Sequence, residues 1–235
     1  MPTVRRMLPS GRLRVVPDHF GVVLALLVAA YVLFVLSDEP WVRVVVTALN
    51  VTALLVAVRA SQPRPPLRTA VRAIVVAGAV AVVLAELTLT RADANGVVDC
   101  VLSVILLTTL ICIVDRILSQ QDVTLRVIAG AISAYLLVGL MFASIFGVVS
   151  WLQSGPFFSD GQTVDAETLQ YFSFSTLTTL GYGDYTSATS AGRGLAALEA
   201  LIGQIFLATL IARLVSSFRR GPALTPQPSE DADPT

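Results

Sequence analysis

The sequence predicts an all-α integral membrane protein with six transmembrane helices and a re-entrant half-helix between the fifth and the sixth. Of its 235 residues, 55% are hydrophobic and only 14% are charged. Long apolar stretches alternate with short polar breaks, and each stretch approaches or exceeds the ~20 residues that a helix needs to cross a bilayer. Only helices satisfy an open backbone in lipid. The expected spans are residues 20–36, 41–58, 70–89, 96–118, 127–151 and 191–218.

The basic residues, all of them arginine, indicate the orientation of these spans. Only Arg43, Arg91 and Arg193 fall on the side opposite the two termini. Because arginine is enriched in cytoplasmic loops, both termini are expected in the cytoplasm of a multi-pass plasma-membrane protein. The absence of lysine favours a GC-rich, bacterial genome. A cleaved signal peptide is the alternative for the first stretch, although residues 36–40 make a poor cleavage site.

A segment shorter than a span, from Asp165 to Thr179, lies outside between the last two spans. Asp165 suits a helix N-cap and Glu167 the first turn. Backbone of this kind is tolerated at membrane depth only where it lines a water-filled cavity or is buried in protein. We therefore predict a half-helix whose negative C-terminal end points toward the centre of the assembly.

Residues 179–183, which begin at the last residue of this half-helix, suit the coordination of a cation. Stripping water from an ion requires successive carbonyls that face one axis, and glycine reaches the necessary backbone angles without steric cost. Gly181 and Gly183 meet that need, and Thr179 adds a hydroxyl oxygen. The side chains of Leu180 and Tyr182 are expected to pack behind the carbonyls. Rings of carbonyls of this kind form ion-selectivity filters.

Residues 176–184, Thr-Leu-Thr-Thr-Leu-Gly-Tyr-Gly-Asp, closely resemble the signature of the potassium-channel pore superfamily. The resemblance extends over the flanking helices, from about residue 127 to residue 218. It implies a potassium channel in which K⁺ is the permeant ion, no cofactor is needed, and Thr179, Leu180, Gly181 and Tyr182 coordinate the ion. One chain supplies one filter strand, so the expected assembly is a homotetramer.

The spans and the composition divide the chain into four expected parts. A cytoplasmic arm (1–19) precedes a peripheral four-helix membrane domain (20–118) and a pore domain (119–218), and a disordered cytoplasmic tail (219–235) follows. The tail is too polar and proline-rich to build a core. Cys100 and Cys112 lie in one apolar stretch without a cluster of ligands, so buried thiols are expected rather than a metal site or a disulfide.

Residues on the half-helix are expected to support the filter. In the family an aromatic cuff surrounds the filter, and here Tyr171, Phe172 and Phe174 take its place. Tyr171 has the hydroxyl needed to hold Asp184, which Phe172 lacks. The usual valine of the filter is Leu180. Ser175 stands where some relatives carry an acidic residue.

The last span carries a buried charge and a candidate hinge. Glu199 lies well inside the span, where an ionisable group is costly, and we expect it to bond to Ser175 or Thr178; a neutral, structurally satisfied carboxyl is the alternative. Gly203 stands at the spacing of the family's inner-helix hinge, and a close-packing contact is the alternative. Residues expected to line the inner cavity are Ala208, Ile211, Ala212 and Val215. Arg213 is expected to anchor the helix end by snorkelling.

Strong voltage gating is not expected. A sensor needs several basic residues at every third position of one span, whereas the fourth span has only Arg116, beside Asp115, and the third only Arg72. The first four spans are thus expected to be a scaffold, with Glu86 and Asp99 available to pair with Arg91. Acidic residues are expected to enrich cations at the outer mouth, unless they belong to an ordinary solvated loop. They are Asp160, Asp165, Glu167 and Asp184.

Three other functions remain open from the sequence: a weakly selective cation channel, a potassium transporter built on pore repeats, and a non-conducting membrane subunit. The intact Tyr182 and Gly183 argue against the first, and the single pore loop argues against the second. An enzyme is not expected, because no nucleophile, base and oxyanion-donor set is present. The expected partners are membrane lipid, K⁺, further copies of the chain and a separate cytoplasmic regulator, and no nucleic acid.

Overall fold

The computed structural model describes residues 20–36, 40–61, 65–120 and 124–218. The cytoplasmic arm predicted over 1–19 and the tail predicted over 219–235 lie outside the described residues. The described residues form seven helices and no strand beyond an isolated bridge between Phe158 and Ser187. In chain order the helices are α1 (Phe20–Leu36), α2 (Pro40–Ser61), α3 (Pro65–Thr88), α4 (Arg91–Leu118), α5 (Leu125–Leu152), α6 (Ala166–Leu177) and α7 (Ser190–Phe218).

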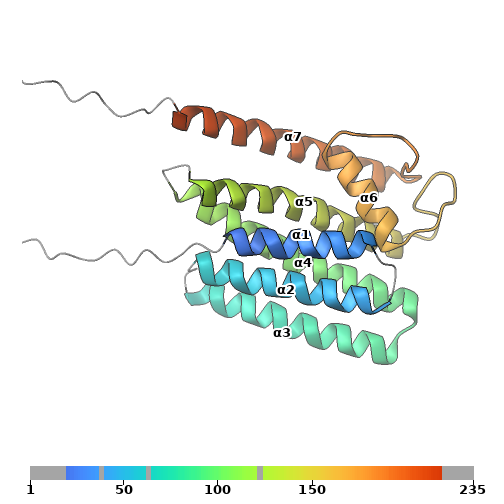
Figure 1. The fold of residues 1–235 in the computed structure, drawn as a ribbon. Helices are drawn as coiled ribbons and strands as arrows, with labels where there is room; N and C mark the ends of the chain where they lie inside the picture. The colour runs from blue at the N-terminus through green and yellow to red at the C-terminus, as the bar shows by residue number, and fades with distance from the viewer. Residues whose placement is uncertain (1–19, 37–39, 62–64, 121–123, 219–235) are drawn as a thin grey trace, which may run out of the picture.

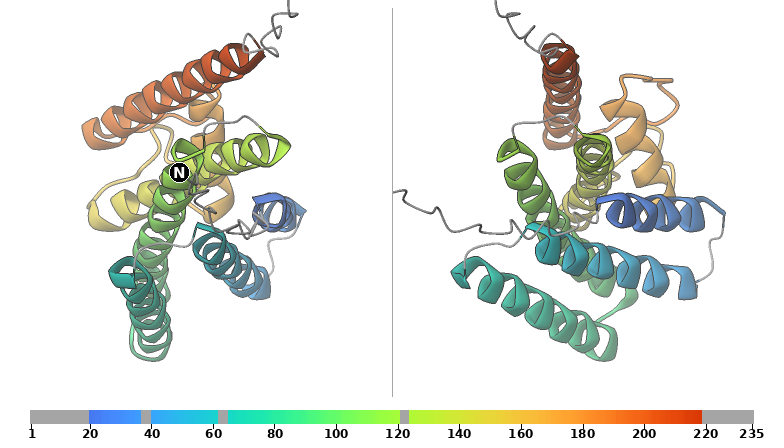
Figure 2. Two further views of the ribbon diagram at one scale, coloured as in Figure 1. Left: turned by 90° about the vertical axis from the view of Figure 1, so that its left-hand side faces the viewer. Right: turned by 60° about the vertical axis from the view of Figure 1, so that its left-hand side comes forward.

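Six of these helices run back and forth along one common direction, and the short α6 lies at one end of the bundle (Figure 1). α1 begins and α7 ends at the opposite end. Two further views show α7 and α6 on one side of α5, with α4 and α2 on the other side and α3 farthest away (Figure 2). The arrangement leaves α7 at the edge of the single chain.

Three of the described helices are long and apolar enough to cross a membrane, judged by length and composition. They are α4, α5 and residues Ser190–Ser216 of α7. The apolar stretches of α1, α2 and α3 are shorter, over Phe20–Leu33, Val45–Arg59 and Thr69–Ala85. The chain is therefore a helical protein suited to a membrane, and the count of six spans stays a prediction.

The start of α3 differs from the sequence-based prediction. The third span was expected to begin at residue 70, yet α3 begins at Pro65 and includes Pro66. Proline is tolerated in the first helical turn, because the N–H that it lacks has no partner within the helix there. The connection between α2 and α3 is therefore shorter than the expected spans suggested.

The larger core joins α1, α4, α5 and α6. Phe20, Leu137 and Phe146 are fully buried in it. A smaller core of buried side chains on α2, α3 and α4 includes Cys112, whereas Cys100 is only half-buried, and these two described cysteines do not form a disulfide. The peripheral helices and the last three helices thus share one apolar interior through α1 and α4.

Close contacts join α4 to α5 at the end that holds α6. Trp151 lies against Gly96, and its indole Nε1 donates to Asp93 Oδ1 at 3.0 Å. The carboxylate of Asp99, which the sequence suggested as a partner for Arg91, lies instead against Gly147 of α5. Glu86, the other suggested partner, has a side chain outside the described set. A side chain larger than glycine at residue 96 or 147 would separate the two helices.

Candidate functional site

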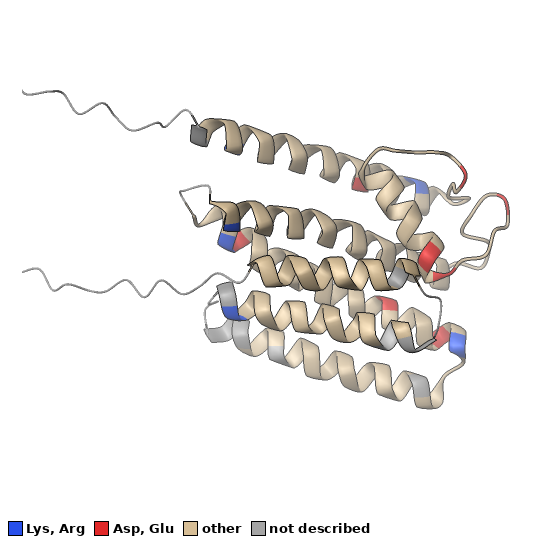
Figure 3. Ribbon diagram, viewed as in Figure 1, with Lys and Arg blue, Asp and Glu red and all other residues tan. Residues whose placement is uncertain are grey.

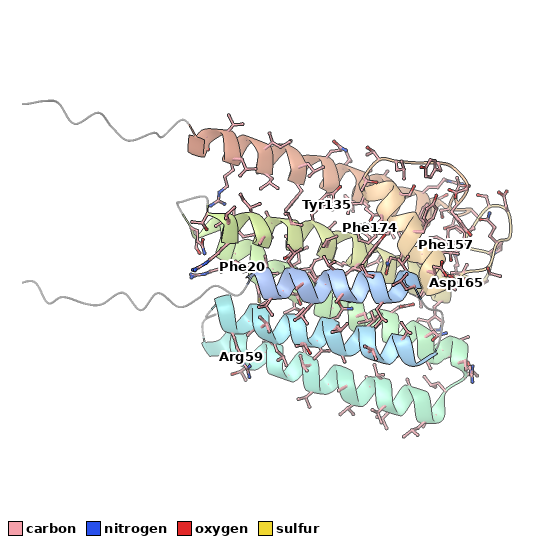
Figure 4. The ribbon with its side chains drawn as sticks, in the orientation of Figure 1. Phe20, Arg59, Tyr135, Phe157, Asp165 and Phe174 are labelled. Atoms are coloured by element: carbon pink, nitrogen blue, oxygen red, sulfur yellow. The ribbon has the colours of Figure 1, made fainter. Side chains whose placement is uncertain are left out.

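α6 begins at the N-cap that the sequence predicts. Asp165 Oδ1 accepts a hydrogen bond from Thr168 N at 2.8 Å, and Thr168 Oγ1 accepts one from Asp165 N at 3.1 Å. This reciprocal pair satisfies amides at the start of the helix, and Glu167 adds a negative charge beside the positive end of the helix dipole. Asp165 lies at the end of the bundle away from Phe20 and Arg59 (Figure 4).

The backbone after α6 turns its amides back toward that helix. Ser175 O accepts hydrogen bonds from Leu180 N at 2.9 Å and from Gly181 N at 3.2 Å, and Ser175 Oγ accepts another from Gly181 N at 3.2 Å. In a planar trans peptide the carbonyl points opposite to the amide N–H. The carbonyls of Thr179 and Leu180 therefore face away from α6.

Backbone dihedrals alternate along residues 179–183, the predicted filter segment. Thr179, Gly181 and Gly183 have positive φ angles of 58°, 55° and 80°, whereas Leu180 and Tyr182 between them do not. Such alternation brings successive carbonyls to the same side of the chain. Glycine adopts positive φ readily, but for a β-branched residue such as Thr179 it is strained. Strain of this kind is typical of functional sites.

The predicted filter segment is exposed in the single chain. The side chain of Leu180 is 53% exposed and that of Tyr182 is 72% exposed. The sequence predicted that both would pack behind the carbonyls, and within one chain they do not. Their packing behind the carbonyls therefore stays a prediction.

The outer end of the filter segment is held by α6 and by the loop before it. Tyr171 Oη donates to Asp184 Oδ2 at 2.8 Å, which brings together the pair suggested by the sequence. Gln162 Nε2 donates to Asp184 O at 3.1 Å. The bond to Asp184 raises the pKa of the Tyr171 phenol to about 12. Tyr171 therefore remains a hydrogen-bond donor at any physiological pH.

The three aromatic residues of α6 face different neighbours. Phe172 packs against Phe146 of α5, with ring centroids 5.0 Å apart. The ring of Phe174 lies 5.0 Å from that of Tyr31 of α1 and also covers Gly139 of α5 (Figure 4). Only Tyr171 forms a hydrogen bond next to the filter segment, to Asp184. The three side chains expected to form the aromatic cuff therefore contact three different parts of the chain.

Glu199 of α7 has a partner that the sequence did not identify. Its carboxyl is fully buried, and Oε1 lies 2.5 Å from the hydroxyl of Ser173. The predicted partners make other bonds: Ser175 Oγ accepts from the Gly181 amide, and Thr178 Oγ1 donates to Phe174 O at 2.7 Å. The expected link between Glu199 and α6 is present, but its partner lies two residues before Ser175 and five before Thr178.

Gly203 lies where α7 approaches the end of α6 most closely. A Cβ atom at this position would stand 2.6 Å from Leu177 O, and the same carbonyl accepts a hydrogen bond from Tyr135 Oη of α5 at 3.2 Å. α7 continues as one helix from Ser190 to Phe218 through this position. The contact matches the close-packing alternative for Gly203, and its role as a hinge stays a prediction.

The residues predicted to line a cavity share the exposed side of α7. Ile211 is 59% exposed and Val215 is 53% exposed, and Ala208 and Ala212 are exposed as well. Gln204 lies near the same side, and its Nε2 stands 3.4 Å from Thr179 Oγ1 at the inner end of the filter segment. This side of α7 is open for a neighbouring chain or a water-filled cavity.

Part of this region matches a known protein family. Residues 134–220, from the middle of α5 to the end of α7, match the family model described as an ion channel. We call this segment the ion channel domain, after the family that it matches. Comparison of the chain with curated proteins and with solved structures finds no match.

The ion channel domain carries acidic residues around the filter segment. Acidic positions gather mainly at the end of the molecule that holds α6 and its loops (Figure 3). Asp160, Asp184 and the start of α6 belong to the loops and the helix at this end, and the Arg193 guanidinium donates to Ala188 O at 3.2 Å. The predicted acidity of this end is therefore present in the fold.

The far end of the ion channel domain contacts the peripheral helices through Arg213. Its Nη2 donates to Ile117 O at 2.9 Å and also to Gln120 O. Ile117 lies in the last turn of α4 and Gln120 lies two residues beyond its end, next to the negative end of the helix dipole. Arg213 therefore joins α7 to the end of α4, and the snorkelling role that the sequence suggested stays a prediction.

Sequence reasoning missed four residues of the ion channel domain: Tyr135, Gln162, Ser173 and Gln204. Each makes its contact across a large sequence separation, for example 42 residues between Tyr135 and Leu177. A polar side chain within an apolar stretch was the available signal for Tyr135 and Gln204. Ser173 carried a weaker signal, because serine is common in helices of every environment.

Proposed function

We propose that the chain is one subunit of a homotetrameric potassium channel, and that Thr179–Gly183 forms one strand of its filter. The observation that carries the proposal is the alternating backbone of this segment, with positive φ at Thr179, Gly181 and Gly183. Carbonyls on one side of the chain replace the hydration shell of K⁺ when four chains surround one axis. K⁺ is coordinated at Thr179, Leu180, Gly181 and Tyr182 as the permeant ion.

The exposure of the filter segment and of α7 supports the assembly of four chains. Leu180, Tyr182, Leu201 and Ile205 are each more than half exposed in the single chain. A filter strand also coordinates an ion only when other strands complete the ring. Neighbouring subunits cover the outer side of α7 and the side chains behind the filter, and the stripe from Ala208 to Val215 faces the inner cavity.

The direction of the helices supports a six-span topology with both termini in the cytoplasm. α1 begins and α7 ends at the same end of the bundle, and the filter segment lies at the other end (Figure 1). Within the described side chains of α1–α4, the arginines are Arg59, Arg91 and Arg116, each close to a helix end. Because the sequence places no regular array of arginines within these helices, the peripheral helices act as a scaffold rather than as a strong voltage sensor. The channel lies in the plasma membrane.

A flux assay on purified protein tests this function. The protein is reconstituted in liposomes loaded with K⁺ and placed in Na⁺, and ion efflux is compared with that from Na⁺-loaded liposomes. Native mass spectrometry of the same preparation gives the number of chains. The expected result is a tetramer that releases K⁺ rapidly and Na⁺ very slowly.

Two other results would contradict the proposal. Equal release of Na⁺ and K⁺ would indicate a weakly selective cation channel. A folded tetramer that releases neither ion at either polarity of an imposed potential would indicate a non-conducting subunit. A protein that is folded but monomeric would contradict a filter built from the strands of four chains.

A further inference from the structure

Three helices of the ion channel domain meet at one hydroxyl group. Ser173 Oγ of α6 lies 2.7 Å from Gly139 O of α5 and 2.5 Å from Glu199 Oε1 of α7. The side chains of Ser173 and Glu199 are both fully buried. We name this group the Ser173 clamp: the Ser173 hydroxyl, the Glu199 carboxyl and the Gly139 carbonyl.

The number of protons in the Ser173 clamp limits the charge on Glu199. A serine hydroxyl has one hydrogen to donate, and the Gly139 carbonyl can only accept. An ionised Glu199 can also only accept, so one of the two short contacts would then join two acceptors without a hydrogen between them. A neutral carboxylic acid removes the conflict, because Glu199 donates to Ser173 and Ser173 donates to Gly139.

The second oxygen of Glu199 points to the same conclusion. Oε2 is buried and has no hydrogen-bond partner within the part of the chain that the structure describes. A buried charge left half unsatisfied is far more costly than a buried neutral group. Two polar groups of the described chain are bonded elsewhere: Tyr135 donates to Leu177 O, and the Arg193 guanidinium donates to the carbonyls of Ser187 and Ala188.

The Ser173 clamp is one of two levels at which α6 is held. One turn further along α6, Leu177 O contacts Tyr135 of α5 and Gly203 of α7. Residues four apart lie on one face of a helix, so α5 and α7 each touch α6 twice, through pairs spaced by four. Between the two levels, Ser175 accepts both bonds from the Gly181 amide. The position of α6 relative to α5 and α7 therefore sets the position of the filter segment.

We propose that Glu199 is a positioning residue held as a neutral carboxylic acid, and that its hydrogen bond to Ser173 fixes α6 and thereby the filter. The effect on ion selectivity rests on the proposed function, whereas the protonation of Glu199 does not. Glu199→Gln keeps a donor of the same size, because its Nε2 takes the place of the acid proton. Glu199→Leu keeps the volume and removes the donor.

Infrared spectroscopy tests the protonation directly. Purified protein at neutral pH, in a detergent without ester groups, should show the C=O stretch of a protonated carboxylic acid, and Glu199→Gln should lack it. A spectrum without this band in the wild type overturns the proposal, whether or not the protein conducts. A band that survives in Glu199→Gln overturns it too, since the proton then belongs to another residue.

Ion selectivity tests the positioning role. Glu199→Gln should keep the wild-type ratio of Na⁺ to K⁺ permeability, and Glu199→Leu should raise it by about tenfold, as expected for one lost buried hydrogen bond. Ser173→Ala, which removes the shared hydroxyl, should raise it similarly and gives a second variant if Glu199→Leu does not fold. Unchanged selectivity in Ser173→Ala and Glu199→Leu would overturn the role in the filter. If the wild type transports neither ion, the proposed function fails, and the infrared band still decides the protonation.

Discussion

The two ends of α7 are held by different parts of the molecule. Near the filter segment, Glu199 and Gly203 pack into α6, so the contacts stay within the ion channel domain. At the far end, Arg213 bonds to the C-terminal carbonyls of α4, which belongs to the peripheral helices. Ile211 and Val215 nearby remain exposed. The position of the filter is therefore set inside the domain, whereas that of the far end depends on contacts outside it.

The largest effect is expected from the filter itself. Gly181→Val places a β-branched side chain at φ 55°, a conformation that such residues avoid. We expect no measurable K⁺ current, with normal insertion into membranes. Gly155→Val is the control, because Gly155 lies in the outer loop with no atom within 4 Å of a Cβ at that position. A current that survives in Gly181→Val would show that ions follow another path.

The close approach of α7 to α6 gives the next largest effect. Gly203→Ala brings a Cβ to 2.6 Å from the Leu177 carbonyl, and overpacking of this kind costs about 1–3 kcal/mol of stability. Gly194→Ala on the same helix meets no atom within 4 Å and should be neutral or stabilising, since alanine is the better helix former. Thermal unfolding of the purified variants measures both. Equal melting temperatures would contradict the close contact at residue 203.

A smaller effect is expected from the bond that holds the outer end of the filter segment. Tyr171→Phe removes only the hydroxyl that donates to Asp184. We expect the variant to conduct and to stop conducting sooner during a sustained potential, by a few-fold at most, as measured in single-channel records. Tyr185→Phe is the control, since its ring still packs against Phe158. Identical records for Tyr171→Phe and the wild type would show that the hydrogen bond from Tyr171 to Asp184 does not stabilise the conducting filter.

The smallest effect on selectivity is expected at the far end of α7. Arg213→Gln removes the positive charge beside the end of α4, an interaction of about 1 kcal/mol for a partly buried site. The ratio of open to closed channels should change by about fivefold, while the preference for K⁺ should stay the same. Arg213→Lys should change this ratio less, because it keeps the charge. A change of ion selectivity in Arg213→Gln would show that the far end of α7 also sets the position of the filter, and would contradict the comparison of the two ends.

The sequence predicted the positions of the helices well, because these depend on local signals, whereas the filter role of residues 179–183 stays a prediction. The apolar stretch 20–36 matches α1 residue for residue, and Asp165 is the N-cap of α6, as its residue type predicted. The partner of Glu199 depends instead on how α6 rotates against α7. Ser173, Ser175 and Thr178 are within five residues of one another, and packing alone selects Ser173.

The function of Arg213 was also beyond the sequence. A long basic side chain near the end of a span is typical of an interfacial anchor. Its actual partners, the carbonyls at the end of α4, are backbone groups 96 and 93 residues away. No residue type identifies a backbone acceptor, so only the three-dimensional contact of α7 with α4 assigns this role.

The reversal potential under bi-ionic conditions tests the central claim most directly. Purified wild-type protein is placed in a planar bilayer with K⁺ on one side and Na⁺ at equal concentration on the other. A carbonyl filter at Thr179–Gly183 predicts a current that reverses only at a potential far from zero, in the direction that opposes K⁺ flow. A reversal potential close to zero would contradict the account.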